Sequence, residues 1–518
     1  MTLAEYLKSI ADAIRARKET TAPINAQNFA AEIMTLGPKF ESIDITENGE
    51  YDVEDYKVAK VLVPTGDTAI GLIQRDITEY NIPYGTTRIG SYAFYNFSNL
   101  KSVGCPETVT DIESYAFESC GLQQIAFPSS LEVIGDYAFS GSSLQSVDIP
   151  NGVAYVGSYS FRNCKSLTNV TIPESVTKLN PYTFQNCGAL ANVNFHDGIK
   201  EFGDYCFETC QNLTIDDKLP SNLEVIGARC FRSCQLSSTG TLIIPASVTS
   251  IGEEAFSYSY PGEPFSVVFL GSLATIPNNC FSSTPITSIT FPTGLTEIGN
   301  GAFYNCDQLT KIDIPYGVTT INKNTCANCD SLTEVVIPKS VTLIDYDAFK
   351  ACPIKTFYIP SSVYYISFGA LKSSSPGYNV VMESETPCRL YDKTFLDETK
   401  LGKIFVPRGT SQEYKSADKW SYYADYIYEF ITVSFNIDTG VMNNENYLYS
   451  IDNGATWEQF TEAQFSIDNA HVVRFKNTDA ETTLLIGTTE GGSDIATIAN
   501  AETTYASASD TTIYVSLA

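Results

Sequence analysis

Cysteine is the residue of this sequence best suited to metal or redox chemistry, with 14 copies in 518 residues. Three cysteine pairs have spacings found in zinc half-sites. They are Cys206/Cys210, Cys230/Cys234 and Cys326/Cys329. Eight cysteines, however, lie three residues after an apolar anchor that itself recurs every 22 to 25 residues. A repeat sets such a register, so the sequence predicts a ladder of small buried thiols and no metal site.

Groups for acid–base or nucleophilic catalysis are scarce. The chain has two histidines, His196 and His471, and imidazole is the side chain most often used as a general base near neutral pH. No phosphate-binding G-x-x-x-x-G-K-[ST] loop and no H-E-x-x-H motif occurs. We therefore expect no enzyme and no cofactor. Paired carboxylates for sugar hydrolysis stay open as an alternative, because 60 acidic residues make chance pairs certain.

The charge balance argues against anionic partners. The chain has 32 Lys and Arg against 60 Asp and Glu, a net charge of −28, which disfavours nucleic acid and anionic membranes. The sequence contains no run of about 18 apolar residues, so no membrane span is predicted. The N-terminal MTLAEYLKSIADAIRARKETT interrupts its apolar residues with Glu5 and Asp12, so we expect an amphipathic helix and not a secretory signal peptide.

A repeat of the form V-x-x-I-G-x-x-A-F-x-x-C-x-x-L-x-x-V-x-I-P runs through most of the chain. Its central apolar anchors are Phe94, Phe117, Phe139, Phe161, Phe184, Phe207, Phe231, Phe256, Phe281, Phe303, Cys326, Phe349, Leu371 and Phe395. A period this short indicates stacked turns of a solenoid. We predict a mostly β fold with a solenoid of about 14 turns, counted from these anchors.

Each part of the unit has a physical role. Leu167, Val170 and Ile172 alternate with polar residues and predict a short strand. Pro173 ends that strand because proline has no backbone donor. The glycine of the I-G step is expected to permit a tight bend, and the anchor phenylalanine is expected to fill the centre of the coil.

This unit closely resembles the BspA-like class of leucine-rich repeats over residues 80–430. The resemblance includes an ending typical of the family, from Val406 to Phe430. In it, Tyr414, Trp420, Tyr423 and Ile427 are expected to close the last turn. The resemblance implies a binding scaffold, commonly associated with adhesion to cell surfaces or matrix, and no catalysis.

The N-terminal segments resemble modules of phage and prophage tail proteins. Residues 1–37 predict a helical attachment module, and residues 38–79 a β-hairpin linker with Asn48-Gly49 as a hairpin signal. The resemblance implies that residues 1–66 bind other virion structural proteins. Fibres are often trimeric, but no heptad stretch long enough to set a trimer is visible, so a homo-oligomer is left open.

Residues 431–518 change to short alternating strands and predict an Ig-like β-sandwich. One segment within it matches the S-x-D-x-G-x-T-W pattern of the Asp-box. The matching residues are Ser450, Asp452, Gly454, Thr456 and Trp457. A sialidase needs several arginines and residues 431–518 offer Arg474 alone, so the motif is interpreted as a structural hairpin.

Polar strand positions predict a binding surface. Asn169, Thr171, Asn192 and Asn194 alternate with the core residues and are expected to face solvent. Late in the array three tyrosines appear near this surface: Tyr358, Tyr364 and Tyr365. Exposed tyrosines can stack on sugar rings. The alternative is that they cover the transition into less regular turns.

Together these observations favour a phage virion protein, either a tail fibre or a host-adhesion component that binds a host-surface glycan or protein. Its expected location is the virion, after assembly in the host cytoplasm. A bacterial BspA-like surface adhesin is the first alternative, and a polysaccharide depolymerase on a viral solenoid is the second.

Overall fold

The computed structural model describes residues 76–216, 218–259, 263–391, 394–395 and 400–429, together with the strand backbone in 56–74 and 431–517. The chain forms two compact units, Met1–Gly271 and Ser272–Ala518. The phage-like segment 1–55, including Asn48-Gly49, lies outside the described residues.

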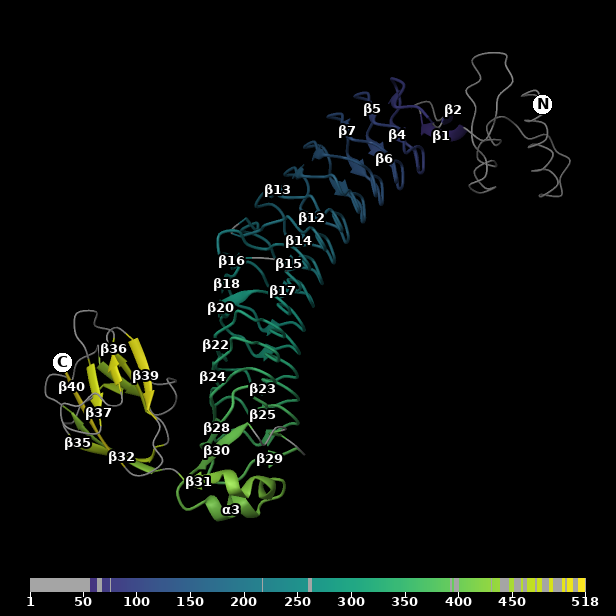
Figure 1. Ribbon diagram of the computed structural model, residues 1–518. Helices are drawn as coiled ribbons and strands as arrows, with labels where there is room; N and C mark the ends of the chain where they lie inside the picture. Colours follow the sequence, from purple (N-terminus) through teal and green to yellow (C-terminus); the bar gives the residue numbers. More distant parts are fainter. Residues whose placement is uncertain are drawn as a thin grey trace, which may run out of the picture. The chain divides into compact units, whose positions relative to one another are not determined.

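One turn of the first unit shows how the sequence builds the coil. In β11 (Asn169–Thr171) the two outer residues are exposed and Val170 is buried, as the alternation predicts. Pro173 follows, and the chain crosses to the two-residue strand β12 (Lys178–Leu179), whose Leu179 is buried. Tight turns then carry Phe184 into the centre. Each turn thus gives one strand to each of two edges (Figure 1).

The repeat strands of the first unit pair in parallel with those of neighbouring turns, as in β11 between β9 and β13. One edge contains β3 (Glu79–Asn81), β5 (Ser102–Gly104), β7 (Gln124–Ala126), β9 (Ser146–Asp148), β11, β13 (Asn192–Asn194), β16 (Thr241–Ile244) and β18 (Phe265–Phe269). The other contains β4 (Arg88–Ile89), β6 (Asp111–Ile112), β8 (Val133–Ile134), β10 (Tyr155–Val156), β12, β14 (Glu201–Phe202), β15 (Val225–Ile226) and β17 (Ser250–Ile251).

The second unit repeats this plan. One edge contains β20 (Ile286–Thr290), β22 (Lys311–Asp313), β24 (Glu334–Val336), β26 (Thr356–Ile359), β28 (Tyr378–Met382), β30 (Leu401–Val406) and β31 (Ile427–Glu429). The other contains β19 (Thr275–Ile276), β21 (Glu297–Ile298), β23 (Thr320–Ile321), β25 (Leu343–Ile344), β27 (Tyr365–Ile366) and β29 (Arg389–Leu390). Because β30 adds a strand after the last predicted anchor, Phe395, the array has about 15 turns.

The anchor phenylalanines form the core of each turn, as predicted. In the first unit Phe94, Phe117, Phe139 and their successors are fully buried. Their rings stack on one another, with centroids 5.0 Å apart for Phe94 and Phe117 and 5.4 Å apart for Phe161 and Phe184. A turn therefore buries its central ring only when a neighbour is present, which makes the turns interdependent.

The glycine of the I-G step serves close packing between turns. A Cβ on Gly157 would lie 2.5 Å from the backbone nitrogen of Asp136 and 2.5 Å from the carbonyl carbon of Gly135, in the preceding turn. The left-handed positions lie elsewhere, two residues before and two after the anchor, as in Tyr159 and Asn163, both with φ 60°. The prediction that this glycine permits a tight bend is therefore wrong. Glycine is needed here because a side chain would collide with the preceding turn.

The thiol ladder is confirmed and has a bonding role. Of the 14 cysteines, 13 are buried and all are free. The thiol three residues after an anchor donates to the anchor carbonyl of the preceding turn, as in Cys187 Sγ to Phe161 O at 3.1 Å and Cys329 Sγ to Phe303 O at 3.0 Å. Cysteine thus supplies a small apolar side chain with one donor.

These thiols are expected to resist alkylation in the native protein. Burial raises the pKa of ladder thiols such as Cys210 and Cys306 well above its usual value. It also raises the pKa of Cys388 and of the half-buried Cys105, both outside the ladder, to about 12. A high pKa removes the reactive thiolate at neutral pH. We expect iodoacetamide at pH 7 to label no cysteine in buffer and all 14 in denaturant. Mass spectrometry of both samples checks this, and rapid native labelling of a thiol of the ladder would contradict it.

Both ends of the array are covered by non-repeat structure. At the start, β1 (Tyr56–Leu62) and β2 (Thr68–Gln74) form an antiparallel hairpin, and β1 pairs with β4. After β30 come α3 (Ser411–Ser416) and η2 (Trp420–Tyr426). The predicted closing residues are all buried there: Tyr414, Trp420, Tyr423 and Ile427.

The C-terminal strands pair in two sheets. The five-stranded sheet contains β32 (Ile431–Ile437), β35 (Gln464–Ala470), β37 (Leu484–Gly487), β38 (Ala496–Ile498) and β40 (Thr511–Leu517). The four-stranded sheet contains β33 (Tyr447–Ser450), β34 (Glu458–Gln459), β36 (Val473–Asn477) and β39 (Ala501–Tyr505). Antiparallel pairing of β33 and β34 brackets the Asp-box. Its residues Asp452, Gly454, Thr456 and Trp457 lie outside the described residues, so the sandwich and its Asp-box contacts stay predictions.

Candidate functional site

Three tyrosines were predicted to face solvent, and for Tyr358 the prediction is wrong. Its side chain is only 9% exposed and lies in a cluster with Val381 and Phe405. The cause is that β28 and β30 place these apolar residues beside it across the sheet. Tyr364 is 62% exposed, as predicted. Tyr365 is half-buried, with the Arg389 guanidinium 5.8 Å from its ring centre.

A set of tyrosines that the sequence analysis did not single out forms a stack on the first unit, here called the tyrosine ladder. It consists of Tyr92, Tyr115, Tyr137, Tyr159, Tyr182 and Tyr205, each two residues before an anchor. Successive rings lie 4.3 to 4.7 Å apart and within 4 to 8° of parallel. The motif Y-x-F in six consecutive turns could have revealed this ladder. Most of each ring face is used by the next ring, so edges and hydroxyls remain for a ligand.

The backbone at these positions makes the choice of tyrosine informative. All six tyrosines have φ between 56 and 62°, a region that glycine and asparagine enter more easily. At the same position the second unit has Asn279, Gly301 and Asn324, with φ 51, 60 and 55°. The backbone conformation does not explain why tyrosine occurs at these positions of the first unit, so its side chain must be what is needed there. Stacked aromatic pairs each contribute about 0.5–1.5 kcal/mol.

Three ladder hydroxyls, those of Tyr115, Tyr137 and Tyr182, remain protonated at physiological pH. Burial, and then the neighbouring hydroxyl of Tyr159, raises the pKa of Tyr182 to about 12. The pKa values of Tyr115 and Tyr137 are raised as well, again with burial as the first cause. These three positions of the ladder thus present neutral donors.

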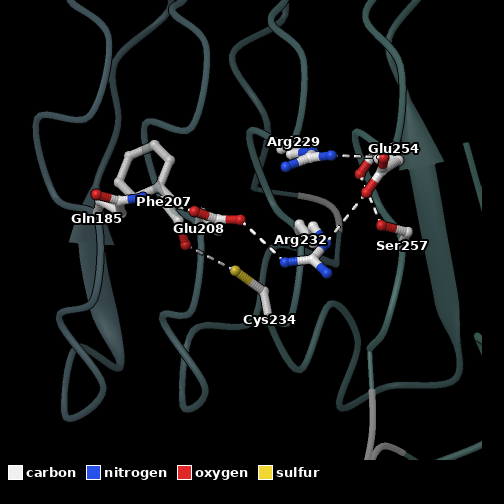
Figure 2. A network of polar contacts seen from close by, with 8 residues as sticks. All are labelled: Gln185, Phe207, Glu208, Arg229, Arg232, Cys234, Glu254 and Ser257. Atoms are coloured by element: carbon white, nitrogen blue, oxygen red, sulfur yellow. Dashed lines mark hydrogen bonds and ion pairs between the residues drawn. The ribbon is translucent and has the colours of Figure 1, made fainter.

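An ionic network continues the ladder (Figure 2). Arg229 takes the next ladder position, with its guanidinium 5.5 Å from the Tyr205 ring centre, and its Nη2 pairs with Glu254 Oε1 at 2.8 Å. Arg232 lies between Glu208 and Glu254, at 3.1 and 3.2 Å. Gln185 Nε2 donates to Glu208 Oε2 at 2.6 Å. These carboxylates are neutralised by arginine, which argues for a structural role and against acid–base chemistry.

Beside this network lies an open depression of about 420 Å³, here called the amide hollow. Its lining comes from three successive turns and includes Asn163, Lys165, Asn186, Gly188, Thr209 and Gln211. Asn186 Nδ2 donates to Asn163 Oδ1 at 3.1 Å. The residue before Asn163 is Arg162, whose guanidinium is 5.6 Å from the Tyr159 ring centre. The turn of Asn163 therefore contributes both to the lining of the hollow and, through Arg162, to a contact with the ladder.

The second unit has its own exposed aromatic surface, here called the aromatic patch. Tyr346 and Phe368 stack with centroids 5.3 Å apart, and Tyr391 meets Phe368 edge-on at 6.2 Å. Lys323 Nζ lies 5.0 Å from the Tyr346 ring centre. Tyr346 and Tyr391 are 38% and 52% exposed. The turns that carry the patch are consecutive, and Tyr365 belongs to the middle one. Tyr365 directly precedes the buried Ile366.

The predicted polar strand surface is confirmed in the first unit. Asn169, Thr171, Asn192 and Asn194 are exposed. Asn192 Nδ2 donates to Asn169 Oδ1 at 3.0 Å, and Thr171 Oγ1 donates to Asp148 Oδ1 at 2.8 Å. Because these groups bond mainly to each other along the edge, they stabilise the stacking of turns.

Neither a metal centre nor a catalytic histidine arises from the described residues. In that part of the chain, no group of three or more His, Cys, Asp or Glu is arranged to hold a metal ion. His196 accepts from the Gly198 backbone at Nδ1, and its Nε2 lies 3.1 Å from Val176 O, which fits a loop residue bonded on both sides. His471 lies outside the described residues. Among the described helices, none is long and apolar enough to cross a membrane.

The repeat sequence matches the model of the BspA type leucine rich repeat region, in six copies over residues 73–153, 132–261 and 265–376. The chain belongs to this family. The BspA-type match begins at residue 73, so the resemblance of residues 1–66 to phage tail modules gains no support from it. No curated protein matches the sequence.

Similar solved structures include other repeat proteins. One is a leucine-rich repeat protein from Bacteroides ovatus, with 26% identity, 63% of this chain and 92% of that chain covered, and a TM-score of 0.49. A leucine rich cell surface protein from Faecalibacterium prausnitzii has 25% identity, 63% and 94% coverage, and a TM-score of 0.41. The pneumococcal vaccine antigen PcpA has 16% identity, 68% and 88% coverage, and a TM-score of 0.41.

A buried carboxylate in the first unit predicts how the free energy of unfolding changes with pH. Asp216 accepts hydrogen bonds from Ser237 Oγ at 2.6 Å, from the backbone and hydroxyl of Ser238 at 2.8 and 3.0 Å, and from those of Thr239 at 3.1 and 3.0 Å. Burial raises the pKa of Asp216, but the hydrogen bonds outweigh burial and lower this pKa from 3.8 to about 2.

Since the folded pKa of Asp216 is depressed, its stabilisation is complete above pH 3.8 and is lost as the pH falls toward 2. We expect about 2 kcal/mol to disappear over this window. Urea unfolding of the protein and of Asp216→Asn at pH 6, 4 and 2.5 checks this. A gap between the two proteins that does not shrink with acid would contradict it.

Proposed function

We propose that this chain is a non-catalytic surface adhesin of a bacterium, which uses its repeat array to bind glycan or protein on a host surface. The observation that carries the proposal is the concentration of partly exposed tyrosine edges and amide groups at the tyrosine ladder and the amide hollow. Such neutral donors, acceptors and aromatic edges suit recognition. In the neighbouring network the carboxylates Glu208 and Glu254 are paired with arginines, which supports binding without acid–base chemistry.

The family supports this proposal better than a virion role does. BspA-type repeats occupy most of the described residues. The virion hypothesis depends on residues 1–66, which lie almost wholly outside the described residues. The depolymerase alternative predicts release of reducing sugar, which gives a direct way to exclude it.

The test is adhesion of the full chain to immobilised mucin and matrix glycoproteins, measured by surface plasmon resonance. Each surface is also used after periodate oxidation, which destroys glycan diols and leaves the protein. We expect saturable binding and no accumulation of reducing sugar in the flow-through. Absence of binding to every surface, or steady release of reducing sugar, would overturn the proposal.

A further inference from the structure

We infer that the amide hollow of the first unit is the site for a linear, neutral oligosaccharide that lies along the stacking direction of the turns. This inference rests on the proposed function and names the ligand class and its place. It concerns Asn163, Asn186 and Thr209, which occupy one position in three successive turns.

The first support is periodicity. On the three turns of the hollow, Tyr159 and Tyr182 stack at 4.3 Å, and Tyr182 and Tyr205 at 4.5 Å. The buried anchor rings of the same turns stack at 5.4 and 5.5 Å. Polar groups therefore recur at short, nearly equal intervals along the hollow. A linear chain of pyranose rings presents its hydroxyls with a similar regularity, so successive sugars can meet equivalent groups.

The second support is the bonding capacity of the lining. Asn163 and Asn186 share one hydrogen bond, Nδ2 to Oδ1 at 3.1 Å. An amide has two donors and two lone pairs, so each side chain retains donors and acceptors for sugar hydroxyls. Thr209 and Gln211 add a hydroxyl and a third amide. Adjacent amide groups that both donate and accept match vicinal diols, which do the same.

The third support is space. A Cβ on Gly188 would meet no atom within 4 Å, and its backbone is not left-handed. Glycine is therefore not required there by the fold of the turn, and the open space above it is available to a ligand. By contrast, a Cβ on Gly157 of the same unit would strike the backbone of its neighbour at 2.5 Å.

Charge favours a neutral ligand over an acidic one. Lys165 is the cation of the lining, and the nearby Arg162 Nε is bonded to Gln185 Oε1 at 2.7 Å. The whole chain has a net charge of −28, which repels polyanionic glycans. The Tyr182 hydroxyl, on the middle turn of the hollow, also stays neutral, because burial raises its pKa to about 12.

The test uses calorimetric titration of the full chain with linear neutral β-linked oligosaccharides, from a disaccharide to a hexasaccharide. We expect affinity to rise with length until the sugar spans the hollow and then to level off. Gly188→Trp fills the open space and should lower affinity at least about tenfold. Gln211→Ala, at an exposed side chain, should lower it about three- to tenfold.

The matched control is Glu174→Trp, which introduces the same indole side chain at an exposed loop residue of the same unit and should leave affinity unchanged. Thermal melts establish that each variant is folded. Binding of acidic oligosaccharides alone, or unchanged affinity in both Gly188→Trp and Gln211→Ala, would overturn the inference. If the wild-type chain adheres to glycoproteins while Gly188→Trp adheres equally, the inference fails and the proposed function stands. If the wild-type chain adheres to no surface, the proposed function itself fails.

Discussion

Replacing Trp420 with alanine is expected to cost about 3–5 kcal/mol of folding stability, because a large and fully buried side chain is removed from the cap of the second unit. Trp420 is 1% exposed and packs edge-on against Tyr414, with ring centroids 4.9 Å apart. Its Nε1 donates to Cys388 O at 2.6 Å. The variant therefore loses packing and leaves a buried carbonyl without this donor.

The loss should be local to the last turns, since stability in a repeat array is a sum over neighbours. Hydrogen exchange is expected to rise first in β28 and β30, which precede the cap. Denaturant unfolding gives the size of the loss. The control is Tyr422→Ala in the same η2 segment, because Tyr422 is 61% exposed and should change stability by no more than about 0.5 kcal/mol. Equal stability of the two variants would contradict the role assigned to the cap.

Gly157→Ala is the second substitution with a large expected effect. Its new Cβ would lie 2.5 Å from two backbone atoms of the preceding turn, and a backbone contact cannot be relieved by a side-chain rotation. We expect a loss of about 2–3 kcal/mol, typical of overpacking in a well-packed interior.

Gly188→Ala provides the matched control, because it adds the same methyl group where nothing lies within 4 Å. Its stability should be unchanged or slightly higher, as the alanine restricts the unfolded chain. Thermal unfolding of both variants checks the pair. A Gly157→Ala protein as stable as Gly188→Ala would show that the turns are not packed as closely as described.

The repeat made the fold predictable from the sequence. The register of Phe184, Cys187 and Val170 fixed which residues are buried, and the cap residues followed from the family ending. The purpose of Gly157 was not predictable, because the collision depends on how closely two turns approach in space. Likewise, the donor role of the Cys187 thiol depends on the position of a carbonyl in another turn.

The candidate site was predicted less well. Tyr358 seemed exposed by alternation, but Val381 and Phe405 come from later turns and cover it. The amide hollow arises where Asn163, Asn186 and Thr209 come side by side, and each of these residues looks ordinary within its own turn. The tyrosine ladder was visible in the sequence as a recurrent Y-x-F, yet its stacking required the spacing between turns.

Hydroxyl-radical footprinting of the full chain, with and without a saturating neutral oligosaccharide, tests most directly whether this repeat protein binds glycan along its first unit. The account predicts reduced oxidation of Tyr159 and Tyr182, while Tyr84 and Tyr316, which are 85% and 83% exposed, keep their full reactivity. Protection at Tyr346 and Tyr391 instead, or no protection of any tyrosine at saturation, would contradict it.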